Sequence, residues 1–200
     1  MKKRKYKQKA RAEQAQETRQ LIVEAAAMLH EELGPAQTTI KAIAEQAGVQ
    51  RLTVYRHFPD ESSLFKACSS HWFGLHPPPA VSGSEDAGDP ITQTSKTLRD
   101  FYQYYRKTER MWQSLYRDID EVEALRGPMS QFESYIDAVH DELLSAWKVK
   151  AKDKKQLSLT LRHCLRYSTW YSLKIDRLSD KQMVDLVMSW LAAVKGGGVI

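Results

Sequence analysis

The chain has 200 residues, of which 42% are hydrophobic and 28% charged, with a formal net charge of +5. This composition excludes a wholly disordered chain, and two cysteines, Cys68 and Cys164, are too few for a disulfide scaffold or a zinc module. The longest apolar stretch, 183–194, is about twelve residues long and contains Asp185, which excludes a membrane span. No apolar segment follows the charged N-terminus, so we expect a cytoplasmic protein.

Basic residues concentrate at the start of the chain. The first 20 residues hold eight Lys and Arg against two Glu, a surplus of +6, so the other 180 residues carry −1. Such a segment buries too little apolar surface to fold alone, and we expect residues 1–16 to form a flexible arm. The arm is either a solvated tail or a nucleic-acid contact through Lys2, Lys3, Arg4 and Lys5.

Helical periodicity runs through the rest of the chain, and alternating strand patterns are missing, which predicts an all-α fold. An N-terminal domain over 17–74 contains four expected helices: 17–33, 40–47, 50–58 and one ending near Phe73. Residues 75–90, rich in Pro, Gly and Ser, are expected to be a linker loop. A larger helical domain over 91–200 follows, with helices expected over 91–107, 109–124, 128–150, 153–176 and 179–195.

The segment 38–58, TTIKAIAEQAGVQRLTVYRHF, predicts a helix-turn-helix. Thr39 can cap the first short helix, and Gly48 can adopt the positive φ of a sharp turn. Apolar side chains at Ile43, Val54 and Phe58 have the spacing of a small core. The exposed start of the second helix then presents a set of polar and apolar side chains, as a major-groove reader does: Gln50, Arg51, Leu52 and Thr53. Tyr55, Arg56 and His57 follow, with donors for phosphate oxygens.

A helical hairpin whose polar residues merely face water is the alternative interpretation. Binding to double-stranded DNA is favoured because four features indicate it together: the cap, the glycine turn, the aromatic-rich helix and the basic arm.

Residues 18–73 resemble the N-terminal domain of TetR-family transcriptional repressors, through AGVxxxTVYRHF followed by Pro-Asp. The resemblance implies a homodimer that binds a palindromic operator and is released by a small ligand in the C-terminal domain. It also implies that Thr39 donates to a phosphate, that Gln50–Thr53 face base edges, and that Tyr55 and His57 clamp the backbone. Arg51 suits a guanine, whose O6 and N7 match its fork.

Two positions depart from the family pattern. Many members carry Ser or Thr where Gln50 stands, and Lys near Glu61. Gln caps a helix poorly, and Glu61 repels a phosphate although it suits the helix dipole. The basic arm is expected to compensate.

The C-terminal domain is rich in aromatic residues, which predicts either ordinary core or an apolar ligand cavity with polar tips. The expected ligand-binding residues are Tyr105, Trp112, Tyr116, Tyr135, His163, Tyr167 and Tyr171, the last three sharing one helix face. Wide apolar stripes on the last helices either pack within one subunit or form a dimer interface. The expected interface residues are Leu161, Leu165, Met183, Leu186, Val187, Trp190, Leu191 and Val194.

Catalytic and nucleotide-binding motifs are missing, and the acidic run 118–123 lacks the glycine of a calcium loop, so no enzyme, metal or cofactor is expected. A ligand-responsive repressor is the favoured function. A DNA-binding dimer whose C-terminal domain serves only dimerisation or protein interaction is the alternative. A third possibility is a small-molecule binding or catalytic domain that merely retains the DNA module.

Overall fold

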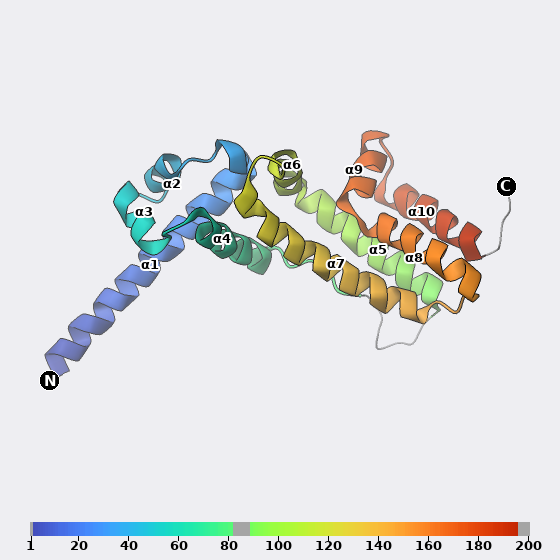
Figure 1. Cartoon of the computed structure of the whole chain (residues 1–200), viewed down its shortest axis with the longest axis horizontal. Helices are drawn as coiled ribbons and strands as arrows, with labels where there is room; N and C mark the ends of the chain where they lie inside the picture. Colours follow the sequence, from blue (N-terminus) through green and yellow to red (C-terminus); the bar gives the residue numbers. More distant parts are fainter. Residues whose placement is uncertain (1, 82–88, 196–200) are drawn as a thin grey trace. The chain divides into compact units, whose positions relative to one another are not determined.

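The computed structural model describes residues 2–81 and 89–195. These residues form ten α-helices and two short 3-10 helices, with no strand among them (Figure 1). The expected all-α class is therefore confirmed. None of the described helices is long and apolar enough to cross a membrane. The chain divides into two compact units: unit 1 is Met1–Pro77 with Arg110–Met129, and unit 2 is Pro78–Glu109 with Ser130–Ile200.

Unit 1 is built on one long helix, α1, which packs against α2, α3 and α4. Its elements are α1 (Lys2–Glu32), η1 (Pro35–Gln37), α2 (Ile40–Gln46), α3 (Arg51–His57), α4 (Glu61–Leu75), most of α6 (Glu109–Asp118), η2 (Glu123–Leu125) and the start of α7 (Arg126–Ala146). The core contains Ile22 and Ala26 of α1, Ala44 of α2 and Val54 of α3, all essentially inaccessible to solvent.

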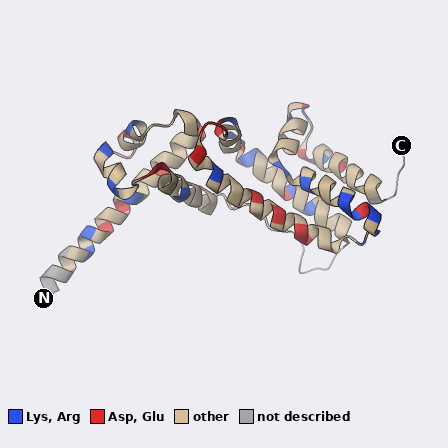
Figure 2. Cartoon of the chain, viewed as in Figure 1, with Lys and Arg blue, Asp and Glu red and all other residues tan. Residues whose placement is uncertain are grey.

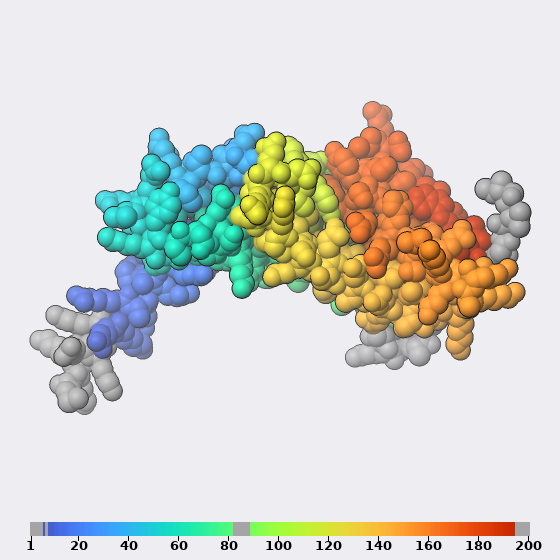
Figure 3. All heavy atoms as spheres, in the orientation of Figure 1, coloured from blue at the N-terminus to red at the C-terminus, as the bar shows by residue number. Residues whose placement is uncertain are grey.

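Helix α1 begins earlier than the sequence pattern suggested, at Lys2 instead of Glu17. Residues 2–16 contain no Gly or Pro and are mostly Lys, Arg, Gln, Ala and Glu, which are good helix formers. Because the buried half of α1 supplies the nucleus, extending the helix needs no further nucleation step. The exposed end of α1 projects beyond the body of unit 1 in the space-filling view (Figure 3).

The turn after α1 is held by two adjacent side chains of α6. Arg117 donates from Nη2 to the carbonyl of Leu33 at 2.9 Å, and Asp118 accepts from the backbone N–H of Ala36 at 3.0 Å. The two side chains also pair with each other, Nε of Arg117 to Oδ1 of Asp118 at 2.6 Å. The hydrogen bond from Arg117 is the main reason that the pKa of the Asp118 carboxyl is lowered. We call these two residues the α6 clamp.

Gly34 makes this close approach possible. Its φ of +94° and ψ of 155° lie in a region that only glycine adopts readily. A Cβ built at this position would stand 1.8 Å from Nη2 of Arg117 and 2.5 Å from Oδ2 of Asp118. The α6 clamp and the residue at position 34 therefore depend on each other.

His30 is buried near the end of α1, with 4% of its surface exposed. Its ring stacks on Phe65 of α4, with centroids 4.5 Å apart and planes 14° apart. Burial lowers the pKa of His30 from 6.5 to about 4, and the nearby charge of Asp118 opposes that shift in part. The imidazole is therefore neutral near neutral pH.

Segment 110–129 packs with the N-terminal helices, although the linear division of the sequence assigned it to the C-terminal domain. The helix expected over 109–124 also ends early, at Asp118. The carbonyl of Asp118 accepts turn hydrogen bonds from the N–H groups of Glu121 and Val122, at 3.1 and 3.0 Å. This turn leads the chain into η2, which contacts α4.

Unit 2 contains α5 (Pro90–Lys107), most of α7, α8 (Ala151–Leu165), α9 (Tyr167–Ile175) and α10 (Asp180–Lys195). Helix α10 packs against both α5 and α8. Acidic residues recur along α7 (Figure 2). Two of them pair with arginines near the end of α8: Asp137 with Arg162 of α8, and Glu133 with Arg166 directly after it, each at 3.4 Å.

The single helix expected over 153–176 is two helices, broken at Arg166, which has extended backbone angles. Hydroxyl groups donate to three carbonyls at the end of α8. Thr169 donates to the carbonyl of His163 at 2.6 Å. Tyr102 and Tyr105 of α5 donate to the carbonyls of residues 164 and 165, at 3.0 and 2.8 Å. The two tyrosines lie far away in sequence, which is why the local pattern did not reveal the break.

Replacing Gly34 with Ala is expected to lower the free energy of unfolding by about 2 kcal/mol or more, because the new Cβ meets the α6 clamp and the backbone is strained. Urea unfolding of the full chain measures the change. Gly74→Ala is the matched control, since a Cβ there meets no described atom within 4 Å and Ala favours the helix. Equal stability of the two variants would contradict the proposed packing.

The buried neutral His30 makes the stability depend on pH. Below pH 6.5 the unfolded chain takes up a proton at this residue, while the folded chain does so only near pH 4. We expect unfolding free energy to fall by up to about 3 kcal/mol over that interval, relative to a His30→Phe variant. Urea titrations of both proteins from pH 7 to pH 4 give the comparison, and parallel pH profiles would exclude this role of His30.

Candidate nucleic-acid interface

Helices α2 and α3 form a helix-turn-helix around Gly48. The N–H groups of residues 47 and 48 close the end of α2, and the N–H of Val49 donates to the carbonyl of Ala44 at 2.9 Å. Gly48 has a φ of +65°, which confirms the positive φ expected from the sequence. Ala44 is 2% exposed, so a larger side chain at that position would push the two helices apart.

The buried face of α3 decides which side chains it presents to solvent. Val54 and Phe58 point into the core, being 0% and 3% exposed. On the opposite face, a contiguous set of side chains is exposed: Gln50, Arg51, Leu52, Tyr55 and Arg56. Thr53 and His57 are half-buried at the margins of this set. We call the set the α3 face.

Arg19 of α1 fixes the end of α3. Its guanidinium carbon lies 4.7 Å above the ring centroid of Phe58, a cation–π contact. From the sequence alone, Arg19 was expected only to contribute to the charge of the N-terminal segment. The contact couples the position of α3 to the long helix.

Thr39 sits at the N-cap of α2 and is exposed. Its Oγ1 accepts the N–H of Ala42 at 3.1 Å, so the hydroxyl proton is still available to a phosphate oxygen. Lys41 lies in the first turn of the same helix, exposed and 3.8 Å from Glu45. Its place beside Thr39 makes it a second candidate for phosphate contact, which the sequence analysis missed.

The two departures from the family pattern have clear local geometry. Gln50 is the N-cap of α3 but forms no side-chain cap hydrogen bond, so its amide is free for another contact. Asp60 caps α4 by accepting the N–H of Ser63 at 2.6 Å, and Glu61 follows in the first turn. Both carboxylates suit the positive end of the helix dipole.

The remaining DNA-binding residues expected from the sequence are Lys2, Lys3, Arg4 and Lys5. Their backbone forms the first turn of α1, and their side chains lie outside the described residues. Figure 2 shows further basic residues along the described part of this helix.

The seven expected ligand-binding residues fall into groups in the two units. Tyr105, Tyr167 and Tyr171 pack ring against ring in unit 2, with centroids of successive pairs 5.5 and 5.7 Å apart. Trp112 and Tyr116 belong to unit 1, with ring centroids 6.2 Å apart.

Three of these residues are placed differently from the expectation. His163 does not share a helix face with Tyr167 and Tyr171, because the helix breaks at Arg166, and His163 is exposed. The hydroxyl of Tyr135 donates to the carbonyl of Pro79 at 2.9 Å. The hydroxyl of Tyr105 holds the α8–α9 break. These polar groups are engaged by the protein itself.

Most of the expected dimer-interface residues are buried within the chain's own fold. Six of the eight are at most 8% exposed: Leu161, Leu165, Met183, Val187, Leu191 and Val194. Their expected contact with a partner is therefore corrected, because α10 packs against α5 and α8 of the same chain and covers them. Leu186 is 37% exposed and Trp190 is half-buried, so these two keep accessible surface. Leu159 of α8, which the sequence analysis did not include, is 60% exposed.

A glycine-pivoted pair of short helices with an exposed polar face on the second defines a helix-turn-helix DNA-binding domain. Comparisons with known proteins specify it further. The sequence profile described as "Bacterial regulatory proteins, tetR family" matches residues 22–68. The regulator TtgR of Pseudomonas putida is 41% identical over 87 residues, which are 43% of this chain and 41% of that protein. AcrR of Shigella flexneri is 45% identical over 53 residues, 26% of this chain and 25% of that protein. The matched segments thus span less than half the length of these relatives.

Solved structures share the fold over most of the chain. A TetR-like transcriptional regulator from Rhodococcus sp. RHA1 has a TM-score of 0.64 at 20% identity, covering 90% of this chain and 97% of that one. AibR, solved with isovaleryl coenzyme A and operator DNA, has a TM-score of 0.61 at 18% identity, covering 87% and 97%. Residues 22–68 thus match the DNA-binding domain of TetR-family regulators, and most of the chain shares the fold of solved TetR-like structures.

Replacing Thr39 with Ala removes the cap of α2 and is expected to lower the free energy of unfolding by about 1 kcal/mol. Thr39→Ser is the matched control, because it keeps the hydroxyl that accepts the N–H of Ala42. Urea unfolding at constant pH measures both variants. If Ala and Ser behave alike, Thr39 does not cap the helix.

Proposed function

We propose that this protein is a dimeric repressor that binds a palindromic operator through the α3 face and is released by a small ligand. The observation that carries the proposal is the α3 face itself. Val54 and Phe58 are buried, which leaves Gln50, Arg51 and Tyr55 on the solvent side. Their amide, guanidinium and hydroxyl groups are suited to contacts with base edges and phosphates.

Arg51 is the proposed base reader. It is the first residue of α3 and is exposed, and the N-terminal residues of a recognition helix are those that reach the groove floor. Gln50, whose amide caps nothing, and Leu52, which is 58% exposed, flank it. Leu52 offers apolar contact, as to a thymine methyl group.

Phosphate contacts are proposed on both sides of this reader. Thr39 and Lys41 lie at the start of α2, and Tyr55, Arg56 and His57 lie toward the end of α3. The basic N-terminal segment of α1 adds sequence-independent attraction to DNA. Seven cations lie within residues 2–11 with no acidic residue among them.

A dimer follows from the size of the reader. Helix α3 has seven residues, about 10 Å of helix, which spans about three base pairs. Two copies on an inverted repeat double the sequence that is read. We propose that the partner binds through the outer faces of α8 and α10, where Leu159, Leu186 and Trp190 keep accessible surface.

The alternative, a dimer without a small effector, gains support from unit 2. The rings of Tyr105, Tyr167 and Trp170 contact one another, and the buried hydroxyls of Tyr102 and Tyr105 serve the backbone. The first function, a repressor with a small effector, is supported by AibR. That protein has a similar fold and was solved with isovaleryl coenzyme A and operator DNA. Selection of bound sequences from random DNA, with and without a panel of apolar and aromatic compounds, distinguishes the two.

Inverted repeats whose recovery falls with one of the compounds would support the ligand-released repressor. Inverted repeats that no compound affects would support the alternative. Sequences without any shared element would contradict both.

Arg51→Ala is expected to relax selection at one base pair of each half-site, with a decrease of about 1–3 kcal/mol in discrimination. Lys41→Ala is expected to weaken all sequences alike and to reduce the salt slope by about 1. Fluorescence anisotropy on the selected site and on single-base variants measures both. Arg162→Ala, on α8 in unit 2, is the charge-matched control and should change neither quantity.

Deleting residues 2–11 removes seven cations, and we expect weaker binding with a flatter dependence on salt. The slope should fall by up to about 0.9 for each phosphate that the segment neutralises in the unmodified chain. The slope is measured by binding titrations between about 50 and 200 mM salt, a range over which phosphate contacts make affinity fall steeply. An unchanged slope would show that the segment does not touch DNA.

A further inference from the structure

A serine, a histidine and an aspartate lie together in unit 2, at a contact between α7 and α8. His140 of α7 is 2% exposed, and its Nε2 lies 3.1 Å from Oγ of Ser158 of α8. Its Nδ1 lies 2.8 Å from Oδ1 of Asp141. Both are hydrogen-bond distances, and the order of hydroxyl, imidazole and carboxylate is that of a nucleophile activated by a general base.

The neighbours of the His140 ring determine where its proton lies. An ionised carboxylate can only accept, so the neutral ring donates from Nδ1 to Asp141. Nε2 is then an acceptor for the hydroxyl proton of Ser158. The carbonyl oxygen of Ser158 also lies 3.0 Å from Nε2. That oxygen can accept a hydrogen bond from Nε2 once the ring has taken the proton from Oγ, which stabilises the product of the transfer.

The hydroxyl of Ser158 is used differently from other hydroxyls on these two helices. Ser134 and Ser145 of α7 donate to carbonyls one turn earlier, at 2.9 and 2.7 Å, and Thr160 of α8 donates to the carbonyl of Gln156 at 2.9 Å. Such a bond occupies the hydroxyl proton. The hydroxyl of Ser158 instead faces the imidazole, and the residue is half-buried, so a small reagent can reach it.

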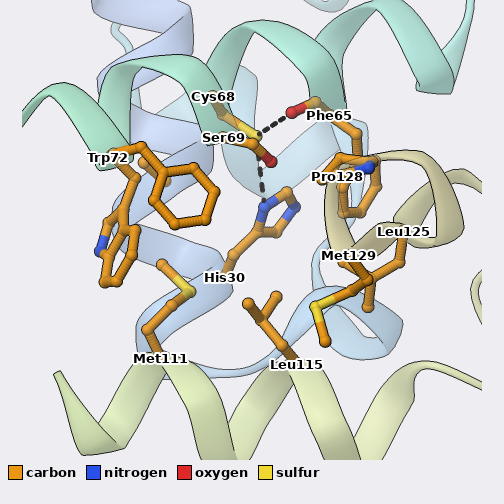
Figure 4. Close-up of a pocket in the computed structure, with 12 residues that line it drawn as sticks. His30, Phe65, Cys68, Ser69, Trp72, Met111, Leu115, Leu125, Pro128 and Met129 are labelled. Carbon is orange, nitrogen blue, oxygen red and sulfur yellow. Dashed lines mark hydrogen bonds between the residues drawn. The ribbon is translucent and has the colours of Figure 1, made fainter. Parts of the chain in front are cut away.

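The other buried histidine of the described chain lacks this chemistry. His30 lies in a pocket of unit 1, with its Nδ1 3.6 Å from Sγ of Cys68 (Figure 4). Burial raises the pKa of that thiol to about 12, so it stays protonated. Burial also lowers the pKa of His30 to about 4, which makes its ring a weak base. No Asp or Glu of the described residues lines that pocket. The activated hydroxyl is therefore in unit 2.

We propose that Ser158 is a modification site that accepts an acyl group from an activated carboxylic ester. Oγ bonds to the carbonyl carbon of the ester while its proton passes to Nε2 of His140. The bond from that carbon to the leaving oxygen then breaks, and the leaving group takes the proton, so that an acyl-serine and an alcohol are formed. Asp141 is the positioning residue that holds Nε2 toward Oγ. The inference does not depend on DNA binding.

The test labels the full-length protein, without DNA, with diisopropyl fluorophosphate. Oγ of an activated serine forms a bond to phosphorus and fluoride leaves, which gives a stable adduct. Mass spectrometry of the digested protein measures the rate at each serine. Ser158 should be labelled on the order of 100-fold faster than Ser145, which is more exposed but has no base beside it.

Acyl transfer itself is measured with p-nitrophenyl acetate on the same protein. Acetylation of Ser158 should also be faster than that of Ser145. The peptides must be resolved residue by residue, because an aryl ester also acylates exposed amines, and Lys154 and Lys155 are exposed one turn before Ser158.

A substitution at Asp141 examines the base without disturbing the packing, since this side chain is 76% exposed. In Asp141→Asn the amide can donate to Nδ1, which moves the ring proton to Nε2 and removes the acceptor for the hydroxyl. Labelling of Ser158 should slow at least about 10-fold. ¹⁵N NMR of the histidine rings should show the proton of His140 moving from Nδ1 to Nε2. Glu142→Gln, at a neighbouring exposed carboxylate, is the matched control and should change neither readout.

The inference is overturned if either reagent modifies Ser158 no faster than Ser145. A ring proton on Nε2 of His140 in the unmodified chain would also overturn it, because Nε2 could not then take the hydroxyl proton. Equal labelling of Ser158 in Asp141→Asn and in the unmodified chain would do the same. Since no DNA is present, none of these outcomes bears on the operator proposal.

Discussion

Burial of Val54 and Phe58 of α3 against α1 is the constraint on which the rest of this structure depends. A seven-residue helix is too short to be stable alone, so α3 exists because its apolar face is covered. With that face fixed, the pitch of the helix leaves Arg51, Leu52 and Tyr55 outside. The cation–π contact from Arg19 holds the same end of α3 to the same helix. Core packing and presentation of the α3 face are thus consequences of one interaction.

A second interaction joins segments that are far apart in sequence. The α6 clamp binds the turn after α1 across more than 80 residues, and Gly34 leaves space for it. His30, whose ring stacks on Phe65 of α4, lies just before this turn. The α6 clamp therefore holds the end of α1 and the end of α6 together within unit 1.

Much of the site could be predicted from local sequence. The cap at Thr39, the positive φ at Gly48 and the alternation of buried and exposed residues on α3 all follow from neighbours within about ten residues, and the structure agrees. Prediction failed where the local structure depends on contacts with residues far away in sequence. The break at Arg166 is stable because Tyr102 and Tyr105 satisfy its carbonyls, and that contact removes His163 from the expected ligand face. The stripe of α10 was correctly found, but the sequence alone did not show that α5 and α8 of the same chain cover it.

The sequence by itself determined the helix-turn-helix and the side chains that its second helix exposes, because those features depend on backbone preferences and side-chain spacing within short segments. Only the tertiary structure decided that 110–129 packs with the DNA-binding helices, that six of the expected interface residues are internal, and that His30 is buried against Phe65. Each of these depends on which apolar surfaces meet in three dimensions. An apolar stripe on a helix shows that this face is buried, but it does not show which other element covers it.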